Sequence, residues 1–248
     1  MDLVPAIAKA DAIFSYLEES RDGAYLKEIS TDLHIPKSTA HRILTTLLSL
    51  HYVEIDTHTS KYALGPKFLA IARTVEKRLS LNRVAHPFMQ ELSLDVLETV
   101  KLSVLRDGKV YVIYSVESPR KMKITVESGT VFPPHVGAAG KLLLAYADEE
   151  EQEQILKGPL DTFTGNTIAS PQLLRSTLQK IREIGFSRDK EEETAGISAL
   201  AFPVYDSADH VRGAVSIPYL TALRKEEELF SPLRTCALQI SRALGASV

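Results

Sequence analysis

The 248-residue sequence predicts an α+β protein built from two domains. Over the first fifty residues, apolar side chains recur at helical spacing, and two short alternating segments follow them. From residue 100 onward, alternating segments predict an antiparallel sheet with helices on its faces. An apolar content of 44% is enough to form hydrophobic cores, which excludes a predominantly disordered chain.

Three helices are expected before residue 50. The first carries an apolar stripe of Ile7, Ala10, Ile13, Phe14 and Leu17. The second covers residues 26–33 and is interrupted by His34-Ile35-Pro36. Because proline is tolerated at the first helical position, the third helix is expected to begin at about Pro36. Its apolar stripe is Ala40, Ile43, Leu44 and Leu47.

The opposite face of this third helix is polar and basic. Residues 34–80 carry seven bases and three acids, although the whole chain has a net charge of −3. Cations and short hydroxyls at a helix N-terminus suit phosphates and base edges. The alternative is an ordinary solvated helix face. The candidate DNA-contacting residues on this helix are Lys37, Ser38, Thr39, His41, Arg42 and Thr45.

The segment after the third helix decides between these interpretations. Residues 52–56 and 61–64 each alternate apolar and polar side chains, which predicts a β-hairpin closed by Gly65-Pro66. A helix, a helix-turn-helix and a hairpin, in that order, are typical of a winged helix-turn-helix. We therefore predict a DNA-binding domain over residues 1–65, with Lys61 as a further phosphate contact, and a linker helix over residues 66–80.

Residues 81–248 predict the second domain. Its expected strands cover residues 100–105, 110–116, 121–126, 199–205 and 213–217, and its expected helices cover 84–97, 142–147, 173–184 and 226–244. The acidic run Glu191–Glu193 is expected to be solvated.

Motif tests argue against several enzyme classes. Gly140-Lys141 is followed by Leu142, which does not fit a P-loop, and the chain has no Gly-x-Gly for a dinucleotide fingerprint. Gly196-Ile197-Ser198 lacks the closing glycine of a nucleophile elbow. The first four histidines are scattered over turn, helix and hairpin without zinc-binding thiols, so we expect neither a metal site nor a cofactor.

Sequence features also favour a cytoplasmic location. The N-terminus lacks a basic segment before its apolar residues, so no secretory signal is expected. The single cysteine, Cys236, rules out an internal disulfide and fits a reducing compartment. The densest apolar stretch, residues 142–147, is far shorter than a membrane span.

The chain resembles the IclR family of bacterial transcriptional regulators along nearly its whole length. The resemblance lies in five ordered segments: residues 35–42, residues 62–65, Gly129 with residues 135–141, residues 164–168, and residues 185–196. It implies a winged helix-turn-helix, a linker helix and a GAF/PAS-like domain that binds a small organic effector. It also implies dimers or tetramers on near-palindromic operators, and no catalysis. The alternatives are a C-terminal enzyme acting on a small metabolite, or a DNA-binding protein without a ligand.

The resemblance also implies an effector site. Its candidate residues are Gly129, His135, Ala138, Ala139, Asp189, Ala199 and Ser216. For His135, the alternative is a turn histidine that caps the following helix. The backbone N–H groups of Ala138 and Ala139, near a helix start, suit a carboxylate. Family members commonly have a hydrophobic-Arg-Cys sequence where this chain has Ile197-Ser198-Ala199, and often Ser-x-Ser where it has Ser216-Ile217-Pro218. These departures predict a less polar pocket and a larger or less polar effector, such as an aromatic or sugar-derived acid.

Overall fold

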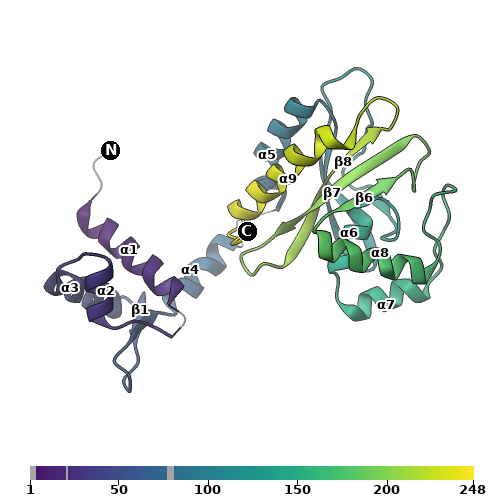
Figure 1. Cartoon of the computed structure of the whole chain (residues 1–248). Helices are drawn as coiled ribbons and strands as arrows, with labels where there is room; N and C mark the ends of the chain where they lie inside the picture. Colours follow the sequence, from purple (N-terminus) through teal and green to yellow (C-terminus); the bar gives the residue numbers. More distant parts are fainter. Residues whose placement is uncertain (1–3, 21, 77–80) are drawn as a thin grey trace. The chain divides into compact units, whose positions relative to one another are not determined.

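The computed structural model describes residues 4–20, 22–76 and 81–248, and the chain forms two compact units (Figure 1). These units comprise residues 1–78 and 79–248. The last residues of the predicted linker helix, 77–80, lie outside the described part of the chain.

The N-terminal unit is a small helical bundle with a hairpin. Its elements are α1 (Pro5–Glu19), α2 (Leu26–Asp32), α3 (Lys37–Ser49), β1 (Val53–Ile55), β2 (Tyr62–Leu64) and α4 (Lys67–Glu76). The predicted apolar stripes meet in one core, in which Ile13, Ile29 and Leu44 are fully buried. The prediction is wrong for Ile7, which is exposed near the start of α1. Strands β1 and β2 are antiparallel, with Val53 opposite Leu64.

The start of α4 packs into this same unit. The ring of Phe68 lies 5.0 Å from that of Phe14 and 5.5 Å from that of Tyr52, edge-on in both cases. Leu69 and Ile71, on the same helix, are exposed. The first turn of α4 is therefore anchored by an aromatic cluster, which stabilises the entry into the helix.

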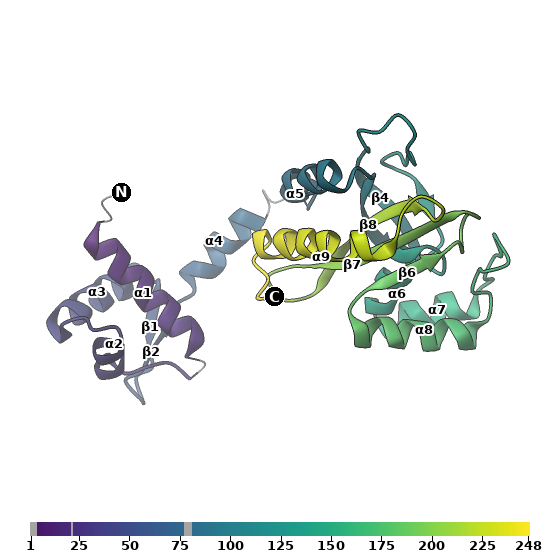
Figure 2. The same cartoon turned by 45° about the horizontal axis from the view of Figure 1, so that its top comes forward.

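The C-terminal unit is an antiparallel sheet between two helical layers (Figures 1 and 2). Within the described residues, six strands follow the order β5-β4-β3-β8-β7-β6. The strands are β3 (Val100–Arg106), β4 (Lys109–Val116), β5 (Val131–Phe132), β6 (Ser187–Lys190), β7 (Ile197–Tyr205) and β8 (Val211–Leu220). The helices are α5 (Leu81–Val96), α6 (Ala138–Tyr146), α7 (Glu149–Lys157), α8 (Pro171–Ile184) and α9 (Glu226–Ala243).

Each face of the sheet has its own hydrophobic core. Helices α5 and α9 cover one face, where Met89 and Leu233 are fully buried against the central strands. Helix α6 covers the other face, with α7 and α8 outside it, and Leu142 and Leu174 are fully buried there. Because α6 is sandwiched between the sheet and α8, nearly all its side chains are buried.

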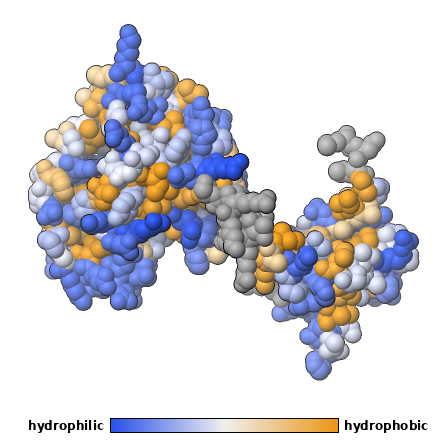
Figure 3. All heavy atoms as spheres, turned by 180° about the vertical axis from the view of Figure 1, so that it is seen from behind, coloured by the Kyte–Doolittle hydropathy of each residue, from blue (hydrophilic) through white to orange (hydrophobic). Residues whose placement is uncertain are grey.

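Polar and apolar side chains are interspersed on the surface of the larger unit in the view of Figure 3. Among the described residues, no helix combines the length and apolar character needed to cross a bilayer.

One predicted strand is wrong. Residues 121–126 form an irregular segment, which is held by a hydrogen bond from Thr99 Oγ1 to the Ile124 carbonyl (2.6 Å). The alternation of this segment therefore does not correspond to strand pairing. Conversely, strand β6 was missed because its sequence, Ser-Arg-Asp-Lys, is entirely polar, although Ser187 and Asp189 are buried.

Candidate functional site

The turn between α2 and α3 is fixed by two reciprocal hydrogen bonds. The Ile35 N–H donates to the Ser30 carbonyl (3.0 Å), and Ser30 Oγ donates to the Ile35 carbonyl (2.8 Å). Ile35 itself is buried in the core. Pro36 occupies the N-cap position, so α3 begins at Lys37, one residue later than expected. These contacts fix the direction in which α3 leaves the turn.

Most of the predicted DNA-contacting residues on α3 are exposed. Ala40, Leu44 and Leu47 face the core, which turns the other side of the helix outward. Thr39 is half-buried, whereas the remaining candidates Lys37, Ser38, His41, Arg42 and Thr45 are exposed. The exposed face of α3 contains no acidic side chain, so it presents positive charge and hydroxyl groups to a partner.

Three of these side chains have further neighbours within the N-terminal unit. Thr39 and Arg42 line the edge of a groove between α3 and the first half of α1. The hydroxyl of Thr45 donates to the His41 carbonyl (2.9 Å), so its hydrogen atom is already used within the helix. Arg42 is exposed, whereas Thr39 beside it is half-buried, so Arg42 is the more accessible of these two candidate base readers.

The hairpin carries Lys61 near its tip. Asp56 Oδ1 accepts from the N–H groups of Thr59 (2.8 Å) and His58 (2.7 Å), and these bonds lower the pKa of the Asp56 carboxyl. The half-buried Lys61 places its ammonium 5.4 Å from the ring centre of Tyr25, at the start of α2. The hairpin and the helix-turn-helix are thus joined by a cation–π contact.

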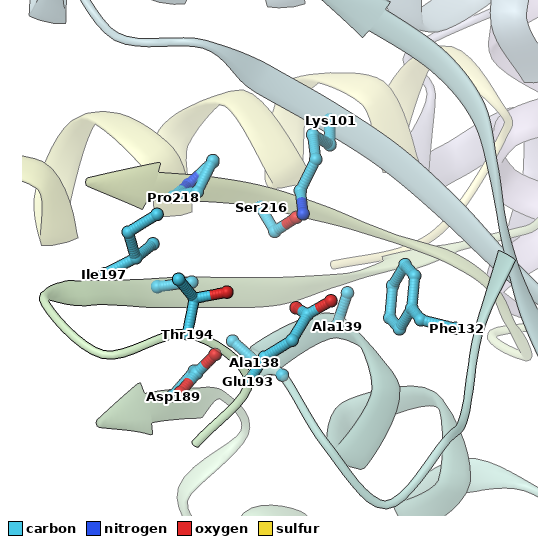
Figure 4. Close-up of a pocket in the computed structure, with 12 residues that line it drawn as sticks. Lys101, Phe132, Ala138, Ala139, Asp189, Glu193, Thr194, Ile197, Ser216 and Pro218 are labelled. Atoms are coloured by element: carbon cyan, nitrogen blue, oxygen red, sulfur yellow. The ribbon is translucent and has the colours of Figure 1, made fainter. Parts of the chain in front are cut away.

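The second candidate site is a pocket in the C-terminal unit, at the N-terminus of α6 (Figure 4). Strands β3 and β8 form one wall, where Lys101 stands directly opposite Ser216 in the strand register. Strands β6 and β7 contribute Asp189 and Ala199, which are also register partners. The turn between β6 and β7 adds Glu193. The pocket encloses about 370 Å³ of space free of protein atoms, including its open mouth.

The start of α6 leaves backbone donors facing this pocket. Gly137 is the N-cap residue, with φ of 72°, and no side chain caps the helix. The first N–H groups of a helix have no partner within it and lie at the positive end of its dipole. Ala138 and Ala139 line the pocket, so their position favours an anionic group there.

Several groups in the pocket have unusual environments. Burial raises the pKa of Asp189 to about 6, although the Glu192 N–H donates to its Oδ1 (2.7 Å) and opposes the shift. Burial lowers the pKa of Lys101, and the carboxylates of Glu193 and Asp189 oppose that shift. The buried Ser216 hydroxyl has no hydrogen-bond partner among the described residues.

Behind the pocket lies a buried ion pair. Lys141 on α6 donates from Nζ to Glu192 Oε1, and both side chains are almost completely buried. The expectation that the run Glu191–Glu193 is solvated is therefore wrong for Glu192. No cluster that could hold a metal ion occurs among the His, Cys, Asp and Glu residues that the structure describes.

Comparison with known protein families identifies both units. Residues 6–57 match the IclR helix-turn-helix domain, and residues 73–242 match the C-terminal domain of the bacterial transcriptional regulator IclR. The chain belongs to the IclR family of bacterial transcriptional regulators.

Relatives within the IclR family span nearly the whole chain. The transcriptional regulator KdgR of Escherichia coli is 32% identical over 98% of this chain and 94% of its own length. The transcriptional repressor AllR of Escherichia coli is 30% identical over 97% of this chain and 90% of its own. The solved structure of the Agobacterium tumefaciens repressor BlcR covers 100% of both chains, with a TM-score of 0.85 at 24% identity, and shows the same fold. The chain is thus a DNA-binding transcriptional regulator and not an enzyme.

Membership of the IclR family allows the expected effector residues to be compared with the pocket. Five of them line it: Ala138, Ala139, Asp189, Ala199 and Ser216. The other two do not line it. Gly129 lies in the loop before β5, where its N–H donates to the Val112 carbonyl (2.7 Å).

His135, the other residue outside the pocket lining, has a structural partner. Its buried ring contacts the Asp161 carbonyl through Nε2 (2.9 Å) and lies against Phe163. This contact joins the turn before α6 to the loop between α7 and α8. The histidine therefore supports the shape of the α6 N-terminus from behind.

Sequence reasoning missed several residues that line the pocket, among them Lys101, Glu193 and Thr194. A lysine within the apolar alternation of residues 100–105 was the available signal for Lys101. These three side chains are charged or polar. The pocket is therefore not apolar, although Ala199 and Pro218 in its lining lack the thiol and the hydroxyl that the family resemblance implies at these positions.

Proposed function

We propose that this regulator changes its affinity for operator DNA when its C-terminal pocket binds a small organic acid. The observation that carries the proposal is the uncapped N-terminus of α6, which faces the same pocket as the buried, unpartnered hydroxyl of Ser216. Buried polar groups rarely lack a partner, so the two together suit an anionic ligand with hydrogen-bond acceptors.

In the proposed DNA complex, α3 enters the major groove. Arg42 and Thr39 read base edges, and phosphates are held by Lys37, Ser38, Thr45 and Lys61. His41 is a further DNA-contacting residue on the same helix. We infer a homodimer or homotetramer in which two such helices lie about 34 Å apart, one DNA turn, on a near-palindromic operator. Because the partner is the bacterial chromosome, we place the protein in the cytoplasm.

The two sites are coupled if the acid binds one arrangement of the oligomer more tightly than another. The proposed route is α4, whose first turn is anchored in the N-terminal unit through Phe68. The GAF/PAS-like character of the C-terminal unit stays a prediction from the family resemblance.

The proposal is tested with the full-length protein and its own promoter region. A panel of organic acids is screened by thermal shift, and each binder is added to an operator-binding assay. We expect at least one acid to raise the unfolding temperature and to change operator affinity, with no consumption of that acid. Binding to DNA that no acid in the panel changes would contradict the proposal.

Replacing Arg42 by alanine should weaken specific operator binding by about 1–3 kcal/mol and relax the preference at one base pair. The reason is that Arg42 is exposed on α3 and has no ion-pair partner within the described parts of the chain. Binding is measured by fluorescence anisotropy on the operator and on single-base variants of it.

Lys61→Ala is the comparison for Arg42→Ala, because it also removes one cation, together with the cation–π contact to Tyr25. A phosphate contact carries no sequence information, so affinity should fall for all sequences alike and its dependence on salt should flatten. Unchanged affinity and specificity in Arg42→Ala would remove Arg42 from the set of base readers.

A further inference from the structure

We propose that Lys101 is the residue with which the pocket recognises the charge of its ligand, and that Asp189 and Glu193 restrict this ligand to a monoanion carrying hydroxyl groups. The inference rests on the proposed function, because it assumes that the pocket binds an organic acid. It adds a specificity-determining residue on β3 and a narrower chemical class of ligand.

The side chain of Lys101 is directed into the pocket, toward the oxygen of Ser216 (Figure 4). The two residues are opposite each other on β3 and β8, so their side chains share one face of the sheet. Nζ of Lys101 has no ion-pair or hydrogen-bond partner among the described residues, and it lies 5.5 Å from the ring centre of Phe132. The Ser216 hydroxyl also has no partner. Two adjacent donors without acceptors make a site for an anion.

The unit contains a lysine that shows the opposite arrangement. Lys141 is buried too, but it is paired directly with Glu192. The negative charges of Glu193 and Asp189 act to raise the pKa of Lys101. Neither carboxylate comes within 4.0 Å of the Lys101 ammonium in the described structure. Lys141 is therefore satisfied inside the fold, whereas Lys101 has its charge available to a ligand.

The opposite side of the pocket carries two carboxylates, beside the backbone donors at the start of α6. Asp189 is buried on β6, and one of its oxygens is engaged by the Glu192 N–H. Glu193 is exposed at the mouth, and an ideal Cβ placed on Gly137 would lie 3.7 Å from its Oε2, so this carboxylate reaches the start of α6. Hydroxyl groups donate well to such carboxylates. A second acidic group on the ligand would instead face like charge.

These features select a class of ligand. A cation with a hydroxyl at one wall holds one acid group, and two carboxylates at the other wall hold hydroxyls and repel a second acid. Monoacids that carry hydroxyl groups therefore suit the two walls of this pocket. Unsubstituted fatty acids, aromatic acids without hydroxyls, and diacids fit less well.

The test uses calorimetry on the full-length protein with matched six-carbon acids: gluconate, hexanoate and glucarate. We expect gluconate to bind about tenfold or more tightly than the other two, the effect of one charge-assisted hydrogen bond. Lys101→Met should weaken gluconate binding by at least about tenfold, and Lys101→Arg should retain most of it. Lys180→Met, which removes an exposed lysine on α8, is the control and should bind as the wild type does.

Glu193→Gln gives an independent readout. Removing this negative charge should bring the affinities for glucarate and gluconate closer together, a change that a purely structural role for Glu193 would not produce. The inference is overturned if Lys101→Met binds gluconate as the wild type does, or if hexanoate or glucarate binds the wild type as tightly as gluconate. If the wild type binds none of these acids and no other organic acid, the proposed function fails with it.

Discussion

Replacing Lys141 by methionine is expected to lower the free energy of unfolding of the C-terminal unit by about 3–5 kcal/mol. Lys141 and Glu192 are 2% and 5% exposed, and they form an ion pair between α6 and the turn after β6. Methionine preserves the length of the side chain but leaves the Glu192 carboxylate buried without a cation. The other Glu192 oxygen, Oε2, already has no partner in the described structure, so no second contact would compensate.

Urea unfolding at neutral pH measures this effect. Lys180→Met, at an exposed position on α8, should change the free energy of unfolding by no more than about 0.5 kcal/mol. The double variant Lys141→Met/Glu192→Met should be much more stable than the single one, because replacing both members of a buried pair removes two desolvated charges. A loss below 1 kcal/mol in the single variant, or a double variant no more stable than the single one, would contradict this account of the pair.

This ion pair also marks the limit of what the sequence could predict. Lys141 lies within an apolar helical segment, and Glu192 lies within an acidic run that local reasoning assigns to solvent. They are 51 positions apart, and only the packing of α6 against the sheet brings them together. Composition and spacing carry no information about such a contact.

Local patterns were more informative in the N-terminal unit. The stripe on α3 and the alternation of the hairpin follow from short-range periodicity, and both appear in the structure. In the pocket, the family resemblance located Ala138, Ala139 and Ser216, but it did not provide Lys101. Lys101 faces the pocket because β3 pairs with β8, and strand pairing over more than a hundred residues is a property of the fold.

Asp189→Asn should make the protein more stable than the wild type at pH 7.5 but not at pH 4. Burial raises the pKa of Asp189 to about 6 from an ordinary value of 3.8, and the carboxylates of Glu192 and Glu193 add to the shift. The folded state thus binds this proton more tightly than the unfolded state does. The contribution of Asp189 to stability therefore falls as the pH rises from about 4 to 6, and it is constant above that range.

A shift of about two pKa units corresponds to about 3 kcal/mol, since each unit is worth about 1.4 kcal/mol. Asparagine has no charge to desolvate, and its side-chain oxygen can still accept from the Glu192 N–H. The difference in free energy of unfolding between variant and wild type should therefore change by about 2–3 kcal/mol between pH 4 and pH 7.5. Asp95→Asn, at an exposed position on α5, is the control for the loss of one carboxylate. If the Asp189→Asn difference does not change with pH, the Asp189 carboxylate is not destabilised in the folded protein. The pocket would then disfavour a second negative charge less strongly than its geometry indicates.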